Sequence, residues 1–396
     1  MFTHSNFIAT LTLAFALTLC AAFLLPAALT AVERRDRVVL RGNSFPAIIE
    51  RETREGIEYR ITPSQPNVQT RRWSEVVEIR YAGMEGGLFQ AGMNDMRAGR
   101  YEEAATRFNA LATGATREWE GAYGFYHLGE AWERAGDYEQ AAAAFAALAG
   151  AFPEHRFWLD ALYRRGINLA HIGNPEAQTV IDELLNYRAQ NPAVGRGPEF
   201  RANAIRAVMQ ARAGQINEAR RTANSVALAP RDGDTWFHWG NYWAQFLFNQ
   251  GEFRDAAQQF QRMLTQVEDN PAQRAQLSLG LGVSLARGGG DRSQAIMELL
   301  KLDTLPYGSP AQRCEAQFWA GRLMLAEARE NKDNEDDRIS SFARTQYQRA
   351  ILLLQAAAAS ISDSPAKAEA QNLLDQLQPE ERGEEAEGGA PVLVEE

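Results

Sequence analysis

The chain has few of the residues on which catalytic and metal sites depend. Its 396 residues include two cysteines and five histidines. Cys20 lies in an apolar N-terminal segment and leaves Cys314 alone in the body, so the sequence supports neither an intramolecular disulfide framework nor a cysteine-based zinc site. It also has no HExxH, no GxxxxGKS loop and no GxGxxG between a strand and a helix. We therefore expect no enzymatic activity, no cofactor and no metal.

Positive charge is also scarce, and lysine most of all. Lys and Arg number 41 against 51 Asp and Glu, and the net charge is -10. A nucleic-acid-binding protein needs a dense basic face, so we expect no nucleic-acid partner. Seven Glu and one Arg lie in Pro379–Glu396, and residues 379–396 are predicted to form an acidic, disordered tail.

Residues 1–31 contain no Asp, Glu, Lys or Arg. An apolar core followed by small residues at Ala27–Ala31 is typical of a secretory signal peptide cleaved near Thr30 or Ala31. The segment is also long enough to remain as a membrane anchor, which needs about 20 apolar residues. Leu17–Cys20 faintly resembles a lipoprotein cleavage box, although Leu19 stands where a small residue is usual. All three alternatives predict export to the periplasm or cell envelope, with membrane contact only through this segment if it is retained.

Residues 32–82 have a strand-like pattern. Short runs rich in Val, Ile, Tyr and Thr alternate with Gly, Pro and Ser, and they occur at Val38–Leu40, Ala47–Arg51, Ile57–Thr62 and Glu75–Tyr81. Four or five short strands in this length predict a small β module that closes as a barrel. The pattern is similar to β modules that precede helical repeats in some secreted bacterial proteins, particularly of planctomycete type. A cap for the repeats and a separate binding module are both open interpretations.

From Met84 onward, apolar residues recur at helical spacing and the sequence repeats itself. The segment Gly99–Ala104 recurs at 136–141, 214–219 and 251–256, with weaker copies at 173–178 and 290–295. The glycine permits a tight turn between two antiparallel helices, and the alanine lets the helices approach closely. Each of the first five copies also has a small residue upstream (Gly92, Gly129, Gly166, Ala207 and Ala244), and large apolar residues fill the helix that follows (Phe108, Phe145 and Phe260).

This repeat resembles the tetratricopeptide-repeat (TPR) family, whose unit is about 34 residues of helix–turn–helix. The resemblance implies a mainly α fold: an α-solenoid of about seven helix pairs and a capping helix over residues 83–378. A charged insertion near 329–343 interrupts the seventh unit. We interpret it as a solvated loop or helix extension, with a partner-specific contact as the alternative.

The resemblance also implies a concave groove lined by the first helix of each unit. Carried over to this sequence, the groove positions predicted to bind a partner are Phe89, Met93, Arg97, Tyr123, Tyr126, Glu130, Arg134, Tyr163, Arg212, His238, Asn241, Tyr242, Gln245 and Phe248; the same register includes Asp160, His171, Arg201, Val208 and Asn249. This mixture of aromatic, amide and arginine side chains suits an extended peptide or a helix.

The helix predicted at residues 236–248 carries seven aromatic residues on all of its faces. Packing between repeats explains a buried stripe, and a partner-binding surface rich in Trp and Tyr is the alternative. Three functions follow as hypotheses. The first is a non-enzymatic extracytoplasmic scaffold or adaptor for protein or peptide partners in envelope assembly or maintenance. The second is a small-molecule or glycan receptor that uses this aromatic helix. The third is a self-associating structural subunit.

Overall fold

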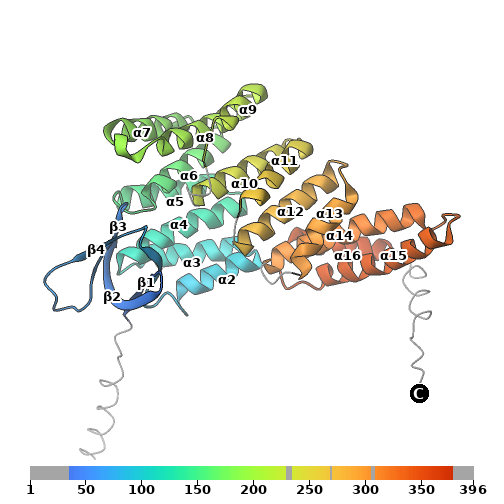
Figure 1. Ribbon diagram of the computed structural model, residues 1–396, viewed down its shortest axis with the longest axis horizontal. Helices are drawn as coiled ribbons and strands as arrows, with labels where there is room; N and C mark the ends of the chain where they lie inside the picture. The colour runs from blue at the N-terminus through green and yellow to red at the C-terminus, as the bar shows by residue number, and fades with distance from the viewer. Residues whose placement is uncertain (1–34, 229–233, 268–269, 305–307, 378–396) are drawn as a thin grey trace, which may run out of the picture. The chain divides into compact units, whose positions relative to one another are not determined.

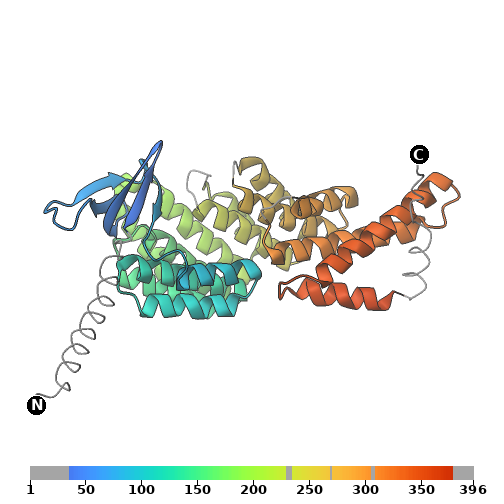
Figure 2. The ribbon, with the colours of Figure 1, turned by 90° about the horizontal axis from the view of Figure 1, so that it is seen from below.

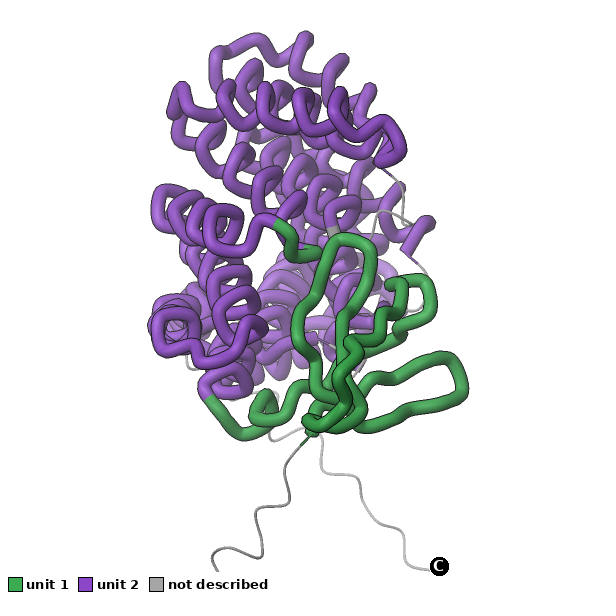
Figure 3. The backbone as a smooth tube through the Cα atoms, turned by 90° about the vertical axis from the view of Figure 1, so that its left-hand side faces the viewer, with its two compact units in different colours: residues 1–87, 154–156 green, residues 88–153, 157–396 purple. Residues whose placement is uncertain are grey.

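The computed structural model describes residues 35–228, 234–267, 270–304 and 308–377 (Figure 1). The export segment and the acidic tail predicted from the sequence lie outside these residues. The chain forms two compact units: residues 1–87 together with 154–156, and residues 88–153 together with 157–396 (Figure 3).

The first unit is an antiparallel five-stranded sheet. Its strands are β1 (Asp36–Leu40), β2 (Asn43–Glu52), β3 (Gly56–Arg60), β4 (Gln69–Arg72) and β5 (Val76–Arg80), in the order β4-β3-β2-β1-β5. The described strands show no pairing between β4 and β5, so the sheet is open and the expected barrel is not formed. Gly42 has φ +84° in the tight β1–β2 turn, a conformation that glycine adopts without steric cost.

Buried side chains on one face hold this sheet together, chiefly Val38, Ile57 and Tyr59. The buried Asp36 side chain accepts hydrogen bonds from the backbone N–H groups of Ile49 (3.1 Å) and Ala82 (2.8 Å). A buried carboxylate is tolerated only when it has such partners. Asp36 therefore fixes the end of β1 against the middle of β2 and the end of β5.

The second unit is an array of antiparallel helix pairs. The first helix of each pair and its partner are, in order, α2 (Leu88–Ala98) with α3 (Tyr101–Thr113), α4 (Glu118–Ala135) with α5 (Tyr138–Ala151), α6 (Trp158–His171) with α7 (Glu176–Gln190), α8 (Gly197–Arg212) with α9 (Ile216–Asn224), α10 (Asp234–Asn249) with α11 (Phe253–Gln266), α12 (Pro271–Arg287) with α13 (Arg292–Thr304), and α14 (Pro310–Asn331) with α15 (Asp337–Ala358). Helix α16 (Pro365–Gln376) follows as a single cap, and a short 3-10 helix η1 (Pro192–Val194) precedes α8. This arrangement confirms the predicted repeat array of about seven pairs.

The turn glycines of the repeat have the conformation for which the sequence selects them. Positive φ values of 63° to 83° occur between the two helices of the first six pairs, at Gly99, Gly136, Gly173, Gly214, Gly251 and Gly289. In the sixth pair the left-handed residue is Gly289, one position before the glycine that the repeat pattern selected. The run of three glycines at 288–290 supplies both turn residues there.

Small residues on the first helix of a pair make room for large rings on the second. A Cβ atom placed on Gly92 would lie 2.7 Å from the ring of Phe108, and one on Gly129 would lie 2.5 Å from the ring of Phe145. Both rings are fully buried. This small-to-large complementarity, which the structure reveals, sets the distance between the helices in these pairs.

The seventh pair takes up its insertion as longer helices. Helices α14 and α15 each have 22 residues, more than any other helix described here, and the connection between them is Lys332–Asp336. The Asp336 side chain caps α15 by accepting the N–H of Arg338 at 2.9 Å. The charged insertion is therefore mostly a helix extension, as the first of the two interpretations proposed.

Two helices far apart in the sequence also contact each other within the second unit. Helix α2 packs beside α14, where a Cβ atom on Gly99 would lie 3.2 Å from the Cβ atom of Ala311. The start of the array thus lies against its seventh pair. Across the residues that the structure describes, no helix has the length and apolar content needed to cross a membrane.

Candidate functional site

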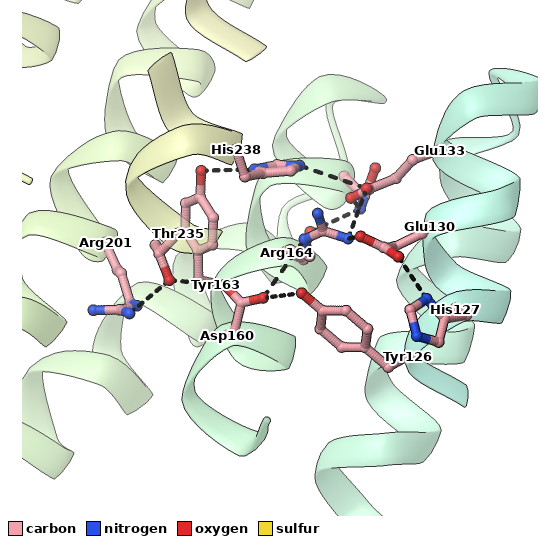
Figure 4. A network of polar contacts seen from close by, with 11 residues as sticks. Tyr126, His127, Glu130, Glu133, Asp160, Tyr163, Arg164, Arg201, Thr235 and His238 are labelled. Atoms are coloured by element: carbon pink, nitrogen blue, oxygen red, sulfur yellow. Dashed lines mark hydrogen bonds and ion pairs between the residues drawn. The ribbon is translucent and has the colours of Figure 1, made fainter. Parts of the chain in front are cut away.

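A buried polar network links α4, α6, α8 and α10, which are the first helices of the second to fifth pairs (Figure 4). Arg164 of α6 lies at its centre, with a side chain that is 7% exposed. Its Nη1 atom is 3.0 Å from Glu130 Oε1 and 3.3 Å from Glu133 Oε2, both of α4. Its Nε atom is 3.7 Å from Asp160 Oδ2, one turn earlier on α6. One guanidinium group is thus surrounded by three carboxylates.

Asp160 extends the network to α8 and α10. The Tyr126 hydroxyl donates to Asp160 Oδ2 at 2.7 Å, and the Thr235 hydroxyl donates to Asp160 Oδ1 at 2.9 Å. Arg201 of α8 in turn donates to Thr235 Oγ1 at 2.7 Å. Thr235, in the first turn of α10, therefore connects this helix to both α6 and α8.

Glu133 joins α4 to the other side of the network. The Asn168 side chain donates to Glu133 Oε1 at 2.7 Å, and His238 Nε2 lies 3.5 Å from Glu133 Oε2. His238 Nδ1 is 3.0 Å from the hydroxyl of Tyr163, so this histidine of α10 bridges α4 and α6. The contacting residues are 35 positions apart for Asn168 and Glu133 and 75 for Tyr163 and His238, and His238 and Glu133 are farther apart still.

The electrostatics of the network keep its carboxylates ionised. Burial by itself would raise the pKa of Glu130, but Arg164 and then His127, which lies 2.7 Å away, hold that pKa far below its usual value. Arg164 likewise outweighs burial at Glu133 and lowers the pKa of that carboxyl. The carboxylates hold the pKa of Arg164 well above its ordinary value against the effect of burial. Removing one member of such a set leaves the others charged in a poorly solvated place, which is strongly destabilising.

Four of the predicted partner-binding residues, Tyr126, Glu130, Tyr163 and His238, belong to this network. Tyr126 and Tyr163 are buried, and burial with the nearby Asp160 carboxylate raises the pKa of Tyr163 well above its usual value. These two side chains position their neighbours and do not present a surface.

Tyr242 belongs to a second, smaller cluster. Its hydroxyl lies 2.6 Å from His171 Nδ1, and the His171 ring is 3.9 Å from the ring of Tyr138. Burial raises the pKa of Tyr242 well above its ordinary value. Burial, and then the positive charge of Arg212, lowers the pKa of His171.

The predicted positions Phe89, Tyr123, Met93 and Phe248 pack against other apolar residues. The Phe89 ring is 6.2 Å from that of Tyr123, and Met93 packs with it against the core that contains Phe108. Phe248 lies 5.1 Å from Phe253 and contacts the hydrophobic cores on both sides of α10.

The remaining predicted positions are more open to solvent. Arg97, Arg134, Arg212 and Gln245 are exposed, and Asn241 is half-buried. Arg97 donates to Asn94 Oδ1 at 2.7 Å, and Gln245 donates to Asn249 Oδ1 at 3.2 Å. Arg134 and Arg212 act electrostatically on Glu130 and His171, so these two arginines flank the two polar clusters.

Sequence reasoning missed Arg164, Glu133, Asn168 and Thr235, which complete the network. A signal was present, because Asp160 and Arg164 are four residues apart on one helix and Glu130 and Glu133 are three apart on another. That spacing puts each pair on one helix face but does not reveal that the two faces meet.

The aromatic side chains of α10 face the protein interior. Trp236, Trp239, Trp243 and Phe246 are buried, and Phe237, Tyr242 and Phe248 are partly buried and packed against the core. Trp239 stacks on Trp243 at 5.6 Å, and Trp243 on Phe246 at 5.4 Å. Packing on several sides of α10 therefore accounts for aromatic residues on all of its faces.

Residues 35–228, 234–267, 270–304 and 308–377 contain no group of three or more His, Cys, Asp or Glu side chains placed to hold a metal ion. The three carboxylates around Arg164 share the positive charge of that one guanidinium group.

Comparison with known proteins identifies one of the repeats. Residues 123–155, which run from α4 through α5, match the family model of the tetratricopeptide repeat. No curated protein matches the chain. A solved tetratricopeptide repeat protein from Parabacteroides merdae aligns at 13% identity over 72% of this chain and 96% of its own, with a TM-score of 0.32. The TPR domain of P58(IPK) aligns at 15% identity over 74% of this chain and 98% of its own, with a TM-score of 0.20. Neither similarity bears on function.

Proposed function

Because the chain carries a tetratricopeptide repeat within an array of helix pairs, we propose that it is a non-enzymatic scaffold that binds a peptide or protein segment along α4, α6, α8 and α10. The observation that carries the proposal is the buried network centred on Arg164. It joins these four helices by side-chain contacts, so their exposed positions form a surface organised before a partner arrives. Binding to an organised surface avoids the entropy cost of ordering it.

The exposed residues around the network suggest what the partner offers. Arg134 and Arg212 lie on α4 and α8, and neither forms a salt bridge among the described residues. Arginine binds carboxylates through two parallel hydrogen bonds. We therefore propose a partner segment with acidic side chains or a free carboxyl terminus.

Affinity capture from the native membrane and envelope fraction tests this proposal. The bait is the full chain beside an Arg134→Glu/Arg212→Glu variant. A control variant, Arg254→Glu/Arg262→Glu, makes the same charge change at exposed positions of the second helix α11. A partner retained by the wild type and the control but lost by the first variant supports the proposal. Equal retention by all three would place the partner elsewhere.

We also propose that the chain is exported and acts in the periplasm or cell envelope. The apolar segment at residues 1–31 is the basis for this, together with the small residues that end it. Cell fractionation and mass spectrometry of the mature N-terminus test it. The mass distinguishes cleavage near Thr30, a retained anchor and a lipid on Cys20, and an intact chain in the cytoplasmic fraction would contradict export.

The two other hypotheses receive less support from the geometry. A sugar ring stacks on an exposed aromatic face, and the rings of α10 are packed into the core. Light scattering across a range of concentrations tests self-association, because a structural subunit would form assemblies in the absence of any partner.

A further inference from the structure

A solvent-facing stripe on α15 combines apolar and basic side chains. Arg338, Phe342, Thr345, Arg349 and Leu352 follow one another at spacings of four, three, four and three residues, so they share one face of the helix. All five are exposed, with Phe342 at 52% and Leu352 at 64%. We call these five residues the outer stripe.

The outer stripe is separate from the face by which α15 belongs to the array. The buried residues of α15 are Ser340, Ala343, Ala350, Leu354 and Ala357, on the opposite side. Ala350, Leu354 and Ala357 belong to the core shared with α14 and α16. Phe342 and Leu352 are therefore not needed to hold the helix in place, and their exposure has no explanation in the fold.

The two arginines of the stripe are not paired with carboxylates of the described residues. The Arg338 and Arg349 guanidinium groups form no ion pair within the described residues, whereas Arg292, a half-exposed arginine of α13, pairs with Glu330 at 2.7 Å. The stripe itself contains no Asp or Glu. Arginines beside exposed apolar side chains are complementary to a partner surface that offers both carboxylates and apolar contacts.

We propose that the outer stripe of α15 is a docking surface for an acidic amphipathic helix of a partner protein. Arg338 and Arg349 are 11 positions apart, which is about 16 Å along a helix. Phe342 and Leu352 are 10 positions apart, or about 15 Å. A partner helix fits when it carries an apolar row of similar length flanked by carboxylates at the spacing of the two arginines. The outer stripe lies on α15, the second helix of its pair, whereas the residues proposed above for peptide binding lie on first helices.

The charges disfavour the two other kinds of occupant. Two copies of the stripe placed face to face would bring arginines together without a carboxylate between them, which is unfavourable. An anionic bilayer would meet the exposed acidic residues Asp333, Glu335, Asp336 and Asp337 at the start of α15 and be repelled by them. A bilayer presents its charge over the whole surface, whereas a helix can place its carboxylates at Arg338 and Arg349 and keep them away from these acidic residues.

A pair of synthetic peptides tests the proposal. The first is a fluorescent helical peptide with leucine at alternating three- and four-residue spacings and glutamate on both flanks. The second replaces each glutamate with lysine. We expect the full chain to bind the glutamate peptide at least tenfold more tightly in fluorescence anisotropy. Phe342→Ser and Arg349→Glu should each weaken that binding by tenfold or more.

Two control variants match these changes. Met297→Ser removes an apolar side chain of α13 that is 61% exposed, and Arg254→Glu reverses an exposed charge on α11. Both should bind the glutamate peptide as the wild type does. All variants should retain the wild-type melting temperature because every altered side chain is exposed.

Several results would overturn the proposal. These are equal affinity for the two peptides, no binding of either, or equal loss in the Met297→Ser control. Binding to vesicles of phosphatidylglycerol and phosphatidylcholine that is lost in Phe342→Ser would assign the stripe to a membrane instead. A concentration-dependent dimer abolished by the same substitution would assign it to a second copy. A lower melting temperature for Phe342→Ser would make the residue part of the fold.

Discussion

Replacing Arg164 with methionine should open the centre of the helical array. Methionine keeps most of the length of the side chain but leaves Glu130, Glu133 and Asp160 without the cation that lies 3.0 to 3.7 Å from them. Removing one partner of a buried ion pair costs about 3–5 kcal/mol. Since one arginine here serves three carboxylates, we expect about 4 kcal/mol or more. This corresponds to roughly a thousandfold change in the equilibrium for local opening.

Hydrogen exchange resolved by mass spectrometry is the suitable assay, because repeat arrays open locally. When both proteins are measured at the same pH, the amides of α4, α6 and α10 in the Arg164→Met variant should exchange up to about a thousandfold faster than in the wild type. Those of α15 should change far less. The adjacent Arg165 is a matched control, since it is half-exposed and its partner Glu176, at 3.4 Å, is 62% exposed. Arg165→Met should cost no more than about 1 kcal/mol.

The effect of Arg164→Met should also depend on pH. In the wild type the pKa values of Glu130 and Glu133 are lowered, so their stabilising contribution is present above about pH 4.5 and is lost as the pH falls through the folded-state values. In the variant, burial and mutual repulsion raise those pKa values, so the destabilisation grows as the pH rises above about 4.5. The ratio of exchange rates, variant to wild type, should therefore be larger at pH 8 than at pH 5. A change below tenfold, a uniform change along the array, or an equal ratio at both pH values would refute this reasoning.

Two further predictions concern packing and acid stability. Gly129→Ala should lower stability by about 1–3 kcal/mol in thermal melts because its Cβ atom would lie 2.5 Å from the buried Phe145 ring. Gly150→Ala, on an exposed helical position with no atom within 4 Å, should raise stability by about 0.5–1 kcal/mol, and equal effects of the two changes would contradict the packing argument. Burial, with a smaller effect of Arg156, lowers the pKa of His155 to about 3, so His155 stays neutral in the folded protein while it gains a proton in the unfolded chain below about pH 6.5. Stability should fall by about 1.4 kcal/mol between pH 8 and pH 5.5 from this residue alone, and His155→Gln should remove that part of the pH dependence in urea titrations.

The sequence predicted those parts of the fold that depend on neighbours along the chain. The turn glycines such as Gly99 and Gly136, the small residue at Gly129 and the large one at Phe145 follow from a local repeat whose copies reinforce one another. The network around Arg164 could not be found in this way, because its contacts join residues on four different helices. Tyr163 and His238, for example, are 75 positions apart.

The same limit explains the mixed outcome for the predicted site residues. The repeat register places a residue on the first helix of a pair, and it does so for Tyr163 and Arg212 alike. It does not say how closely the next helix approaches. Tyr163 is fully buried where His238 of α10 meets it, whereas Arg212 at the end of α8 is exposed. A role of the exposed positions in partner binding stays a prediction.

The contact between α2 and α14 changes how this array should respond to damage at its ends. In a repeat protein whose units touch only their neighbours, the terminal units fray independently and a truncation is felt locally. Here the first helix rests against the seventh pair at Gly99 and Ala311. The two ends therefore share one interface, and loosening either exposes the other. Deleting the seventh pair, α14 and α15, should raise amide hydrogen exchange in α2 and α3 more than in α8 and α9. Helices α8 and α9 lie closer to the deletion along the chain.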